Sequence, residues 1–253
     1  MIKTFFKTIL YIPLYNLLIF FAWLVPGHSI GWAIIILTVL IRLALYPSSA
    51  KSVKIQKKIQ EMQPELDKIK ETHKDDKNAQ AQATMQFYTQ NKINPLSGCL
   101  PLLIQLPILY IMYYVFKVGL DESRFDLLYS FVPHPEKINT LFLGMDLSHP
   151  SIYLAVIAGI LQFIQAKQVL NKNNSPKKAV TGASDNMGQF QNILTGQMTY
   201  FFPVMTVVIA MQLPSALAIY WIITTLFMIL QQWWIYKSKN QDVSVKIRKA
   251  NND

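Results

Sequence analysis

Long apolar stretches alternate with shorter polar ones along most of the chain. Five of them come close to the roughly 20 residues that an α-helix needs to cross the hydrocarbon of a bilayer, and they cover residues 29–47, 94–116, 150–168, 195–213 and 215–236. The last two run together, and Pro214 followed by Ser215 is the natural point for the chain to reverse. The pattern predicts an all-α integral membrane protein with five transmembrane helices.

The chain divides at the ends of these stretches. The predicted order is an N-terminal interfacial or anchor helix (1–25), span 1 (26–50), a cytoplasmic helical hairpin (51–93), span 2 (94–116), an extracytoplasmic loop (117–149), span 3 (150–168), a cytoplasmic loop (169–194), span 4 (195–213), span 5 (214–236) and a basic cytoplasmic tail (237–253).

The first 25 residues allow three interpretations. Residues 8–25 are apolar enough to span, but they contain Pro13, Asn16 and aromatic residues that favour the membrane interface. The segment is an uncleaved signal anchor, a sixth span or an amphipathic helix in the outer interface.

The polar insert between the first two apolar stretches has a helical repeat. A narrow apolar stripe at spacings of three and four predicts one helix, the run THKDDKN interrupts it, and a second stripe predicts an antiparallel partner. Pro64 lies inside the first arm, where it kinks the helix or starts a new one. The hairpin either only links two spans or is a docking arm for another component. The two stripes are Ile55, Ile59, Met62, Leu66 and Ile69, and Ala81, Met85 and Tyr88.

Charge gives an orientation. Only 15% of residues are charged, against roughly 25% in a soluble domain, and the net charge is +10. Lys and Arg collect on the cytoplasmic side of bacterial membrane proteins. Residues 51–92 contain nine Lys, 167–190 contain four, and 237–253 contain five Lys or Arg. Five spans that start outside place all three basic segments in the cytoplasm, with the N-terminus outside and the C-terminus inside.

Arg42 is the only basic residue in its apolar stretch. An arginine at the centre of a bilayer costs about 2.5–3.5 kcal/mol on insertion scales. Arg42 therefore either extends its guanidinium to the phosphate level or faces a water-filled cavity within the bundle, on the same helix face as Thr38.

Other spans contain amides and hydroxyls but no Asp or Glu. Side-chain amides in lipid need partners, so they are expected to face the bundle interior. The missing carboxylates argue against a proton-coupled pump. The residues concerned are Gln105, Gln162, Gln165, Gln212, Thr206, Thr224 and Thr225.

Motifs of enzyme chemistry are not found. The four His are scattered over loops, without metalloprotease spacing, a nucleophile elbow or a P-loop, and Cys99 is the only cysteine, which excludes an intramolecular disulfide. We expect no enzyme activity, no cofactor and no metal site.

Three separate stretches carry recognisable motifs: GWAIIILTVLIRLALYP before the charged hairpin, INPLSGCLPLLIQLPILYIMYY in the second span and LPSALAIYWIITTLFMILQQ in the last span. Together they resemble the YidC/Oxa/Alb superfamily of membrane protein insertases, in which the second and third motifs are similar to the signatures of the second core span and the last span. Asp146 and Leu147 match the residues before the third span. The chain resembles the short form that lacks a large periplasmic domain.

The resemblance implies a five-helix insertase core around a hydrophilic groove that opens to the cytoplasm, with an interfacial N-terminal helix. The groove arginine falls on Arg42 and the substrate-contacting threonine on Thr38, while the last-span aromatic pair falls on Tyr220 and Trp221. With Gln105 and Gln162, these residues form the predicted substrate groove in a bacterial cytoplasmic membrane. The implied partners are nascent membrane proteins, the ribosome, the Sec translocon, components of the signal-recognition-particle pathway and the lipid bilayer. The rival functions are a small-solute transporter or channel, and an assembly factor for membrane complexes without insertase activity.

Overall fold

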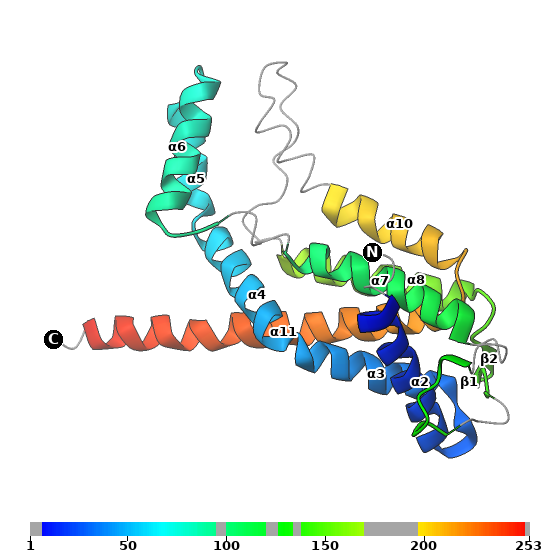
Figure 1. Ribbon diagram of the computed structural model, residues 1–253. Coiled ribbons are helices and arrows are strands. Elements are labelled where there is room, and N and C mark those ends of the chain that lie inside the picture. The colour runs from blue at the N-terminus through cyan, green and yellow to red at the C-terminus, as the bar shows by residue number, and fades with distance from the viewer. Residues whose placement is uncertain (1–6, 95–99, 120–125, 134–137, 170–196, 251–253) are drawn as a thin grey trace. The chain divides into compact units, whose positions relative to one another are not determined.

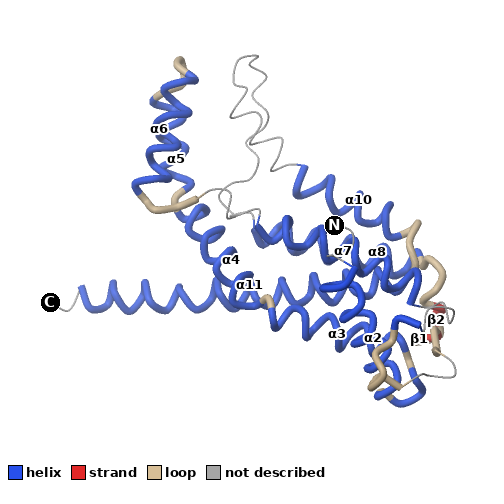
Figure 2. Tube along the Cα trace, viewed as in Figure 1, coloured by secondary structure: helices blue, strands red, loops and turns tan. Residues whose placement is uncertain are grey.

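A computed structural model describes residues 7–94, 100–119, 126–133, 138–169 and 197–250. Within these ranges the chain is helical apart from turns, loops and one small antiparallel sheet (Figure 2). It divides into two compact units, one of residues 1–45, 102–162 and 203–227, the other of residues 46–101, 163–202 and 228–253. Cys99 and nearly all of the loop predicted over 169–194 lie outside the described residues.

The first unit begins with two apolar helices that pack against each other (Figure 1). A π-turn over Lys7–Tyr11 leads into α2 (Ile12–Leu24), with Pro13 in its first turn, where the missing N–H costs no hydrogen bond. A 3-10 turn over Pro26–His28 then leads into α3 (Ile30–Ala44).

The remaining helices of the first unit are apolar as well. They are α7 (Leu100–Gly119), the first part of α8 (Ile152–Val169), α10 (Phe202–Ala210, preceded by a π-turn over Gln197–Phe201) and the first part of α11 (Ser215–Ala250). One apolar core joins side chains from these helices; its largest fully buried members include Tyr15, Ile34, Met112, Phe116, Leu217 and Tyr220.

A buried amide joins α2 to the segment that follows α7. Asn16 is 3% exposed. Its Nδ2 donates to the backbone oxygens of Ile12 (2.8 Å) and Leu127 (3.0 Å), and its Oδ1 accepts from the Tyr129 N–H (2.6 Å). Asn16, the amide that distinguishes α2 from an ordinary apolar span in sequence, is therefore hydrogen-bonded within the protein.

A two-stranded hairpin lies beside the start of α3. Strands β1 (Leu141–Phe142) and β2 (Met145–Asp146) pair antiparallel, with Leu141 opposite Asp146. The two residues between the strands, Leu143 and Gly144, have φ of 50° and 78°. Positive φ at both positions is the geometry that a two-residue β-hairpin turn requires.

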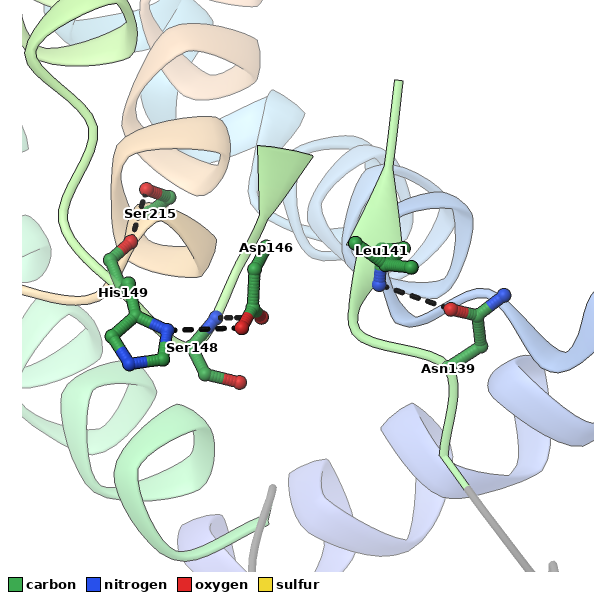
Figure 3. Close-up of polar contacts among 6 residues, drawn as sticks. All are labelled: Asn139, Leu141, Asp146, Ser148, His149 and Ser215. Atoms are coloured by element: carbon green, nitrogen blue, oxygen red, sulfur yellow. Dashed lines mark hydrogen bonds and ion pairs between the residues drawn. The ribbon is translucent and has the colours of Figure 1, made fainter. Parts of the chain in front are cut away.

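This hairpin fits closely onto α3. A Cβ added to Gly31 would lie 2.3 Å from two ring carbons of Phe142. The Phe142 ring also meets Trp32 edge to face, with centroids 5.4 Å apart. Asn139, which Figure 3 shows accepting from the Leu141 N–H (3.0 Å), also accepts through its backbone oxygen from the N–H of Ile30 (3.0 Å).

The residues after β2 cap the first turn of α11 (Figure 3). Asp146 accepts from the Ser148 N–H (3.0 Å) and contacts the His149 ring at 2.9 Å. The His149 carbonyl accepts from both the hydroxyl (2.5 Å) and the N–H (3.1 Å) of Ser215, and the Leu147 carbonyl accepts from Ala216 N–H (3.1 Å). Two of the four N–H groups that a helix start leaves without intrahelical partners are thus satisfied by a loop.

The second unit contains the polar insert. It forms α4 (Tyr46–Glu61), α5 (Gln63–Thr72) and α6 (Lys77–Gln90), and α5 and α6 lie side by side (Figure 1). Pro64 is in the first turn of α5, so the break before it starts a new helix. Asp76 caps α6 by accepting from the N–H groups of Asn78 and Ala79.

Most residues of the predicted apolar stripe lie in the core of the helical hairpin. Leu66, Tyr88 and Ile93 are buried, and Ile55, Ile59, Met62 and Phe87 pack against them. The prediction that Met85 belongs to this core is wrong, because Met85 is 60% exposed. Burial raises the pKa of the Tyr88 hydroxyl above its ordinary value.

The length and composition of a helix decide whether it can cross a membrane. Among the residues that the structure describes, two helical stretches, Lys7–Leu24 and Ser215–Lys237, are long and apolar enough to cross a membrane, and a third qualifies if α3 and α4 are taken together. Shorter apolar stretches occur over Gln105–Phe116, Ile152–Gln168 and Thr199–Ala210. The division into five spans and an interfacial N-terminal helix stays a prediction.

Candidate functional site: a buried arginine cluster

Arg42 lies in the last turn of α3 and is buried, with 8% of its surface exposed. It donates through Nη2 to Oε1 of Gln105 on α7, and through Nε to Oγ1 of Thr224 on α11 (3.4 Å). Its guanidinium is therefore bonded to neutral groups of two other helices.

Gln105 joins the arginine to a third side chain. While its Oε1 accepts from Arg42, its Nε2 donates to the hydroxyl of Tyr220 at 2.9 Å. Tyr220 is 1% exposed and lies one helical turn before Thr224 on α11. We call Arg42, Gln105, Tyr220 and Thr224 the arginine cluster; all four belong to the first compact unit.

The arginine cluster carries a positive charge without a balancing carboxylate. Among the described residues, the only ion pair within 4 Å joins Asp146 and His149. A guanidinium keeps its charge at any physiological pH. The cluster can therefore attract and hydrogen-bond an anionic or polar group, but it has no side chain suited to proton transfer at neutral pH.

The other predicted groove residues are not bonded to this cluster. Thr38 is 1% exposed, and its hydroxyl donates to the Ile34 carbonyl of its own helix at 2.6 Å. Trp221 forms a separate pair, in which its Nε1 donates to Oε1 of Gln162 at 3.3 Å.

The expectation that every span amide faces the interior holds in part. Gln165 is buried and donates to the Met228 sulfur at 3.5 Å, and Thr206, Thr224 and Thr225 are buried. Gln212 is exposed, so the expectation is wrong there; its Nε2 donates to the Val208 carbonyl one turn earlier in its own chain segment. A Gln at a helix end satisfies its donor locally and needs no partner helix.

Thr224 is the residue of the cluster that sequence reasoning did not place in the site. It was expected only to face the bundle interior. Its spacing of four from Tyr220 puts both side chains on one face of α11, and that spacing is the signal that identifies it. No group of three His, Cys, Asp or Glu gathers to form a metal site anywhere in the described ranges.

Residues 20–242 match the family model described as 60Kd inner membrane protein. The chain belongs to this family. The match covers most of its length, including all four residues of the arginine cluster.

Curated relatives agree with the 60Kd inner membrane protein assignment. "Membrane protein insertase YidC" of Fusobacterium nucleatum is 35% identical over 211 residues, which are 83% of this chain and 87% of the relative. "Membrane protein insertase YidC 1" of Halalkalibacterium halodurans is 36% identical over 232 residues, which are 88% of this chain and 76% of the relative. The Coxiella burnetii protein of the same name is 33% identical over 225 residues, only 34% of its own length.

Membership in the 60Kd inner membrane protein family confirms the resemblance and the all-α membrane class. With the apolar helices, it identifies a multi-pass protein of a bacterial inner membrane. The relatives are named as insertases, which are not classical enzymes.

Proposed function

We propose that this chain is a membrane protein insertase that receives nascent apolar segments beside the arginine cluster and releases them into the bilayer. The observation that carries the proposal is the guanidinium of Arg42, buried and bonded only to neutral side chains. The names of the relatives support the same activity.

The physical argument starts from the cost of the buried charge. An arginine in a membrane span costs about 2.5–3.5 kcal/mol, and such residues mark functional sites rather than packing. A positive centre with no carboxylate attracts the polar or acidic flank of an incoming segment, because the Coulomb energy of unit charges is far larger near a protein interior than in water. In the proposed groove, Arg42 holds that flank while Gln105 and Thr224 orient the guanidinium.

Release into lipid then needs no nucleotide. Transfer of the segment's own apolar surface out of water yields about 25 cal/mol per Å². The protein's part is to shorten the apolar layer that the polar flank must pass. The proposed groove residues are Arg42, Thr38, Gln105, Gln162, Tyr220 and Trp221, to which the structure adds Thr224 as a partner of Arg42.

The proposed topology follows the basic segments. The N-terminus lies outside and the C-terminus in the cytoplasm, with α3, α7, α8, α10 and α11 as the five spans. This places the α5–α6 hairpin in the cytoplasm, where the ribosome, the Sec translocon and the signal-recognition-particle pathway are the proposed partners. The basic tail over 237–253 supports ribosome contact, because Lys and Arg neutralise RNA phosphates.

Complementation of an insertase-depleted bacterium tests the proposal. Wild type, Arg42→Ala and Arg42→Lys are expressed at matched membrane levels, and protease protection reports insertion of a small substrate with an acidic flank. Wild type is expected to rescue, Arg42→Ala to fail and Arg42→Lys to retain partial activity, because charge is the postulated requirement. Lys51→Ala, which removes an exposed charge from α4, is the matched control and should rescue.

Rescue by Arg42→Ala as complete as by wild type would refute the role of the charge and leave Arg42 as an anchor at the phosphate level. Failure of the wild-type protein to insert any substrate, although it reaches the membrane, would refute the insertase function itself.

A further inference from the structure

A shallow pocket of about 300 Å³, mostly open to the surroundings, lies in the second compact unit, where the apolar part of α11 ends. Gln168 of α8 lines it together with Trp233, Tyr236 and Lys237 of α11. We call it the Trp233 cavity. It lies apart from the arginine cluster in sequence, and its volume is at the lower end of the range for small-molecule pockets.

The walls of the Trp233 cavity are fixed by contacts with α4. The Tyr236 hydroxyl accepts from Nε2 of Gln60 at 3.3 Å, and the Tyr236 carbonyl accepts from Nζ of Lys57 at 2.8 Å. Lys57 is itself buried, with 8% exposed. Nearby, Gln165 of α8 bonds to Met228 of α11. Bonds from two other helices thus hold this part of α11.

The Trp233 cavity has two polar groups of interest, the ammonium of Lys237 and the side-chain oxygen of Gln168, which lacks a hydrogen-bond donor. Nζ of Lys237 lies 4.8 Å from the centroid of the Trp233 ring, and no carboxylate of the described residues pairs with it. The buried Oε1 of Gln168 has no hydrogen-bond partner within the same ranges. A buried acceptor left without a donor costs free energy, so a ligand that donates to it gains affinity.

Position and chemistry together define the ligand. Trp and Tyr favour the level of lipid head groups, and the spanning part of α11 ends at Lys237. Trp233 is 57% exposed, so the cavity is open at this level. Lys167, the residue before Gln168, does not line the cavity; its ammonium lies over the Phe163 ring (4.5 Å). Basic pockets between membrane helices at this depth recognise anionic head groups.

We propose that the Trp233 cavity binds the head group of an anionic phospholipid that carries hydroxyl groups, of the phosphatidylglycerol type. The lipid phosphate pairs with Lys237, and a glycerol hydroxyl donates to Oε1 of Gln168. The acyl chains lie in the bilayer beside α8 and α11. Phosphatidylmethanol carries the same single negative charge but no hydroxyl donor, and phosphatidylcholine lacks both the donor and the net charge.

Native mass spectrometry of the full-length protein in detergent tests this, with phosphatidylglycerol, phosphatidylmethanol and phosphatidylcholine offered at equal concentrations. Phosphatidylglycerol is expected to be retained best. Lys237→Ala should weaken its retention about fivefold, the effect of one cation at a membrane surface, and Lys237→Arg should restore it. Gln168→Leu should lower phosphatidylglycerol retention to the level of phosphatidylmethanol without changing the latter. Lys51→Ala removes an equal charge from exposed α4 and should change nothing.

Equal retention of phosphatidylglycerol and phosphatidylcholine by wild type would overturn the proposal, and so would equal losses in Lys237→Ala and Lys51→Ala. Retention of glycerol 3-phosphate as strong as that of the lipid would overturn the assignment to a membrane lipid. Because lipid retention is measured rather than insertion, these outcomes leave the proposed insertase function untouched.

Discussion

Gln105→Glu tests whether the arginine cluster works by its unbalanced charge. Gln105 accepts from Arg42 and donates to Tyr220. A glutamate of the same length keeps an acceptor for Arg42, and the Tyr220 hydroxyl can reverse its role and donate to the carboxylate. The substitution therefore preserves the bonded geometry while the new carboxylate balances the positive charge of the guanidinium. Insertion activity should therefore fall, while the unfolding temperature should not.

The magnitude follows from Coulomb's law. A substrate carboxylate about 6 Å from Arg42, with an effective dielectric constant near 20, is attracted by about 3 kcal/mol. Cancelling that attraction lowers occupancy of the site roughly a hundredfold, since about 1.4 kcal/mol corresponds to a factor of ten. The new contact with Arg42 is charge-assisted and stronger than the neutral bond it replaces, so the unfolding temperature should not fall.

Insertion into proteoliposomes that contain the purified protein provides the assay, with two substrates that differ only in an acidic or a neutral flank. We expect Gln105→Glu to abolish insertion of the acidic-flank substrate and to affect the neutral one less. Gln212→Glu adds the same charge at an exposed position of the segment after α10 and is the matched control.

Wild-type insertion of the acidic-flank substrate by Gln105→Glu, in a protein that melts normally, would refute the charge mechanism. An equal loss in Gln212→Glu would also refute it, because the effect would then come from added negative charge at any place.

Three further substitutions test the parts that support the site. Gly31→Ala places a methyl group against the Phe142 ring and should destabilise by about 1–3 kcal/mol through overpacking, measured by thermal unfolding in detergent; an unchanged melting temperature would contradict the close approach. Asn16→Ala should cost roughly 2 kcal/mol in the same measurement, since it leaves buried backbone groups without partners, and full stability would show that water replaces the amide. The Ser148 N–H is the main cause that lowers the pKa of Asp146 from 3.8 to about 2. The ionised carboxylate therefore contributes stability that is complete above about pH 4 and is lost as the pH falls from about 4 to 2. Asp146→Asn should remove this dependence of the melting temperature on pH between about 4 and 2, and an unaltered dependence would contradict the argument.

The sequence predicts the helices because a single rule governs them. A run of apolar residues in a membrane must satisfy its backbone internally, so α3, α8 and α11 follow from hydropathy alone. The break before Pro64 follows from the chemistry of proline. The small sheet could not be predicted, because two residues per strand leave no alternation to detect.

The sequence predicts most of the residues that form the arginine cluster, but it does not predict which of them bond to each other. Arg42 and Gln105 are 63 positions apart, and no local spacing indicates that they meet. Thr38 shares a helix face with Arg42, yet its hydroxyl bonds to its own backbone, a competing local bond that hydroxyl side chains often form in helices. The exposed Met85 departs from its stripe because the neighbouring Phe87 packs against the hairpin core instead.

The capping of α11 by a loop restricts how this helix can move. Two backbone carbonyls, from Leu147 and His149, hold its first turn. Sliding or rotating the helix about its own axis would break both bonds at once, whereas tilting about the capped end strains them least. Displacement of a side chain under such a tilt grows with its distance from the pivot, at 1.5 Å of helix per residue. Tyr220 lies about 8 Å along the axis from Ser215 and Thr224 about 14 Å, so within the arginine cluster a tilt of α11 moves the Thr224 hydroxyl nearly twice as far as the Tyr220 side chain.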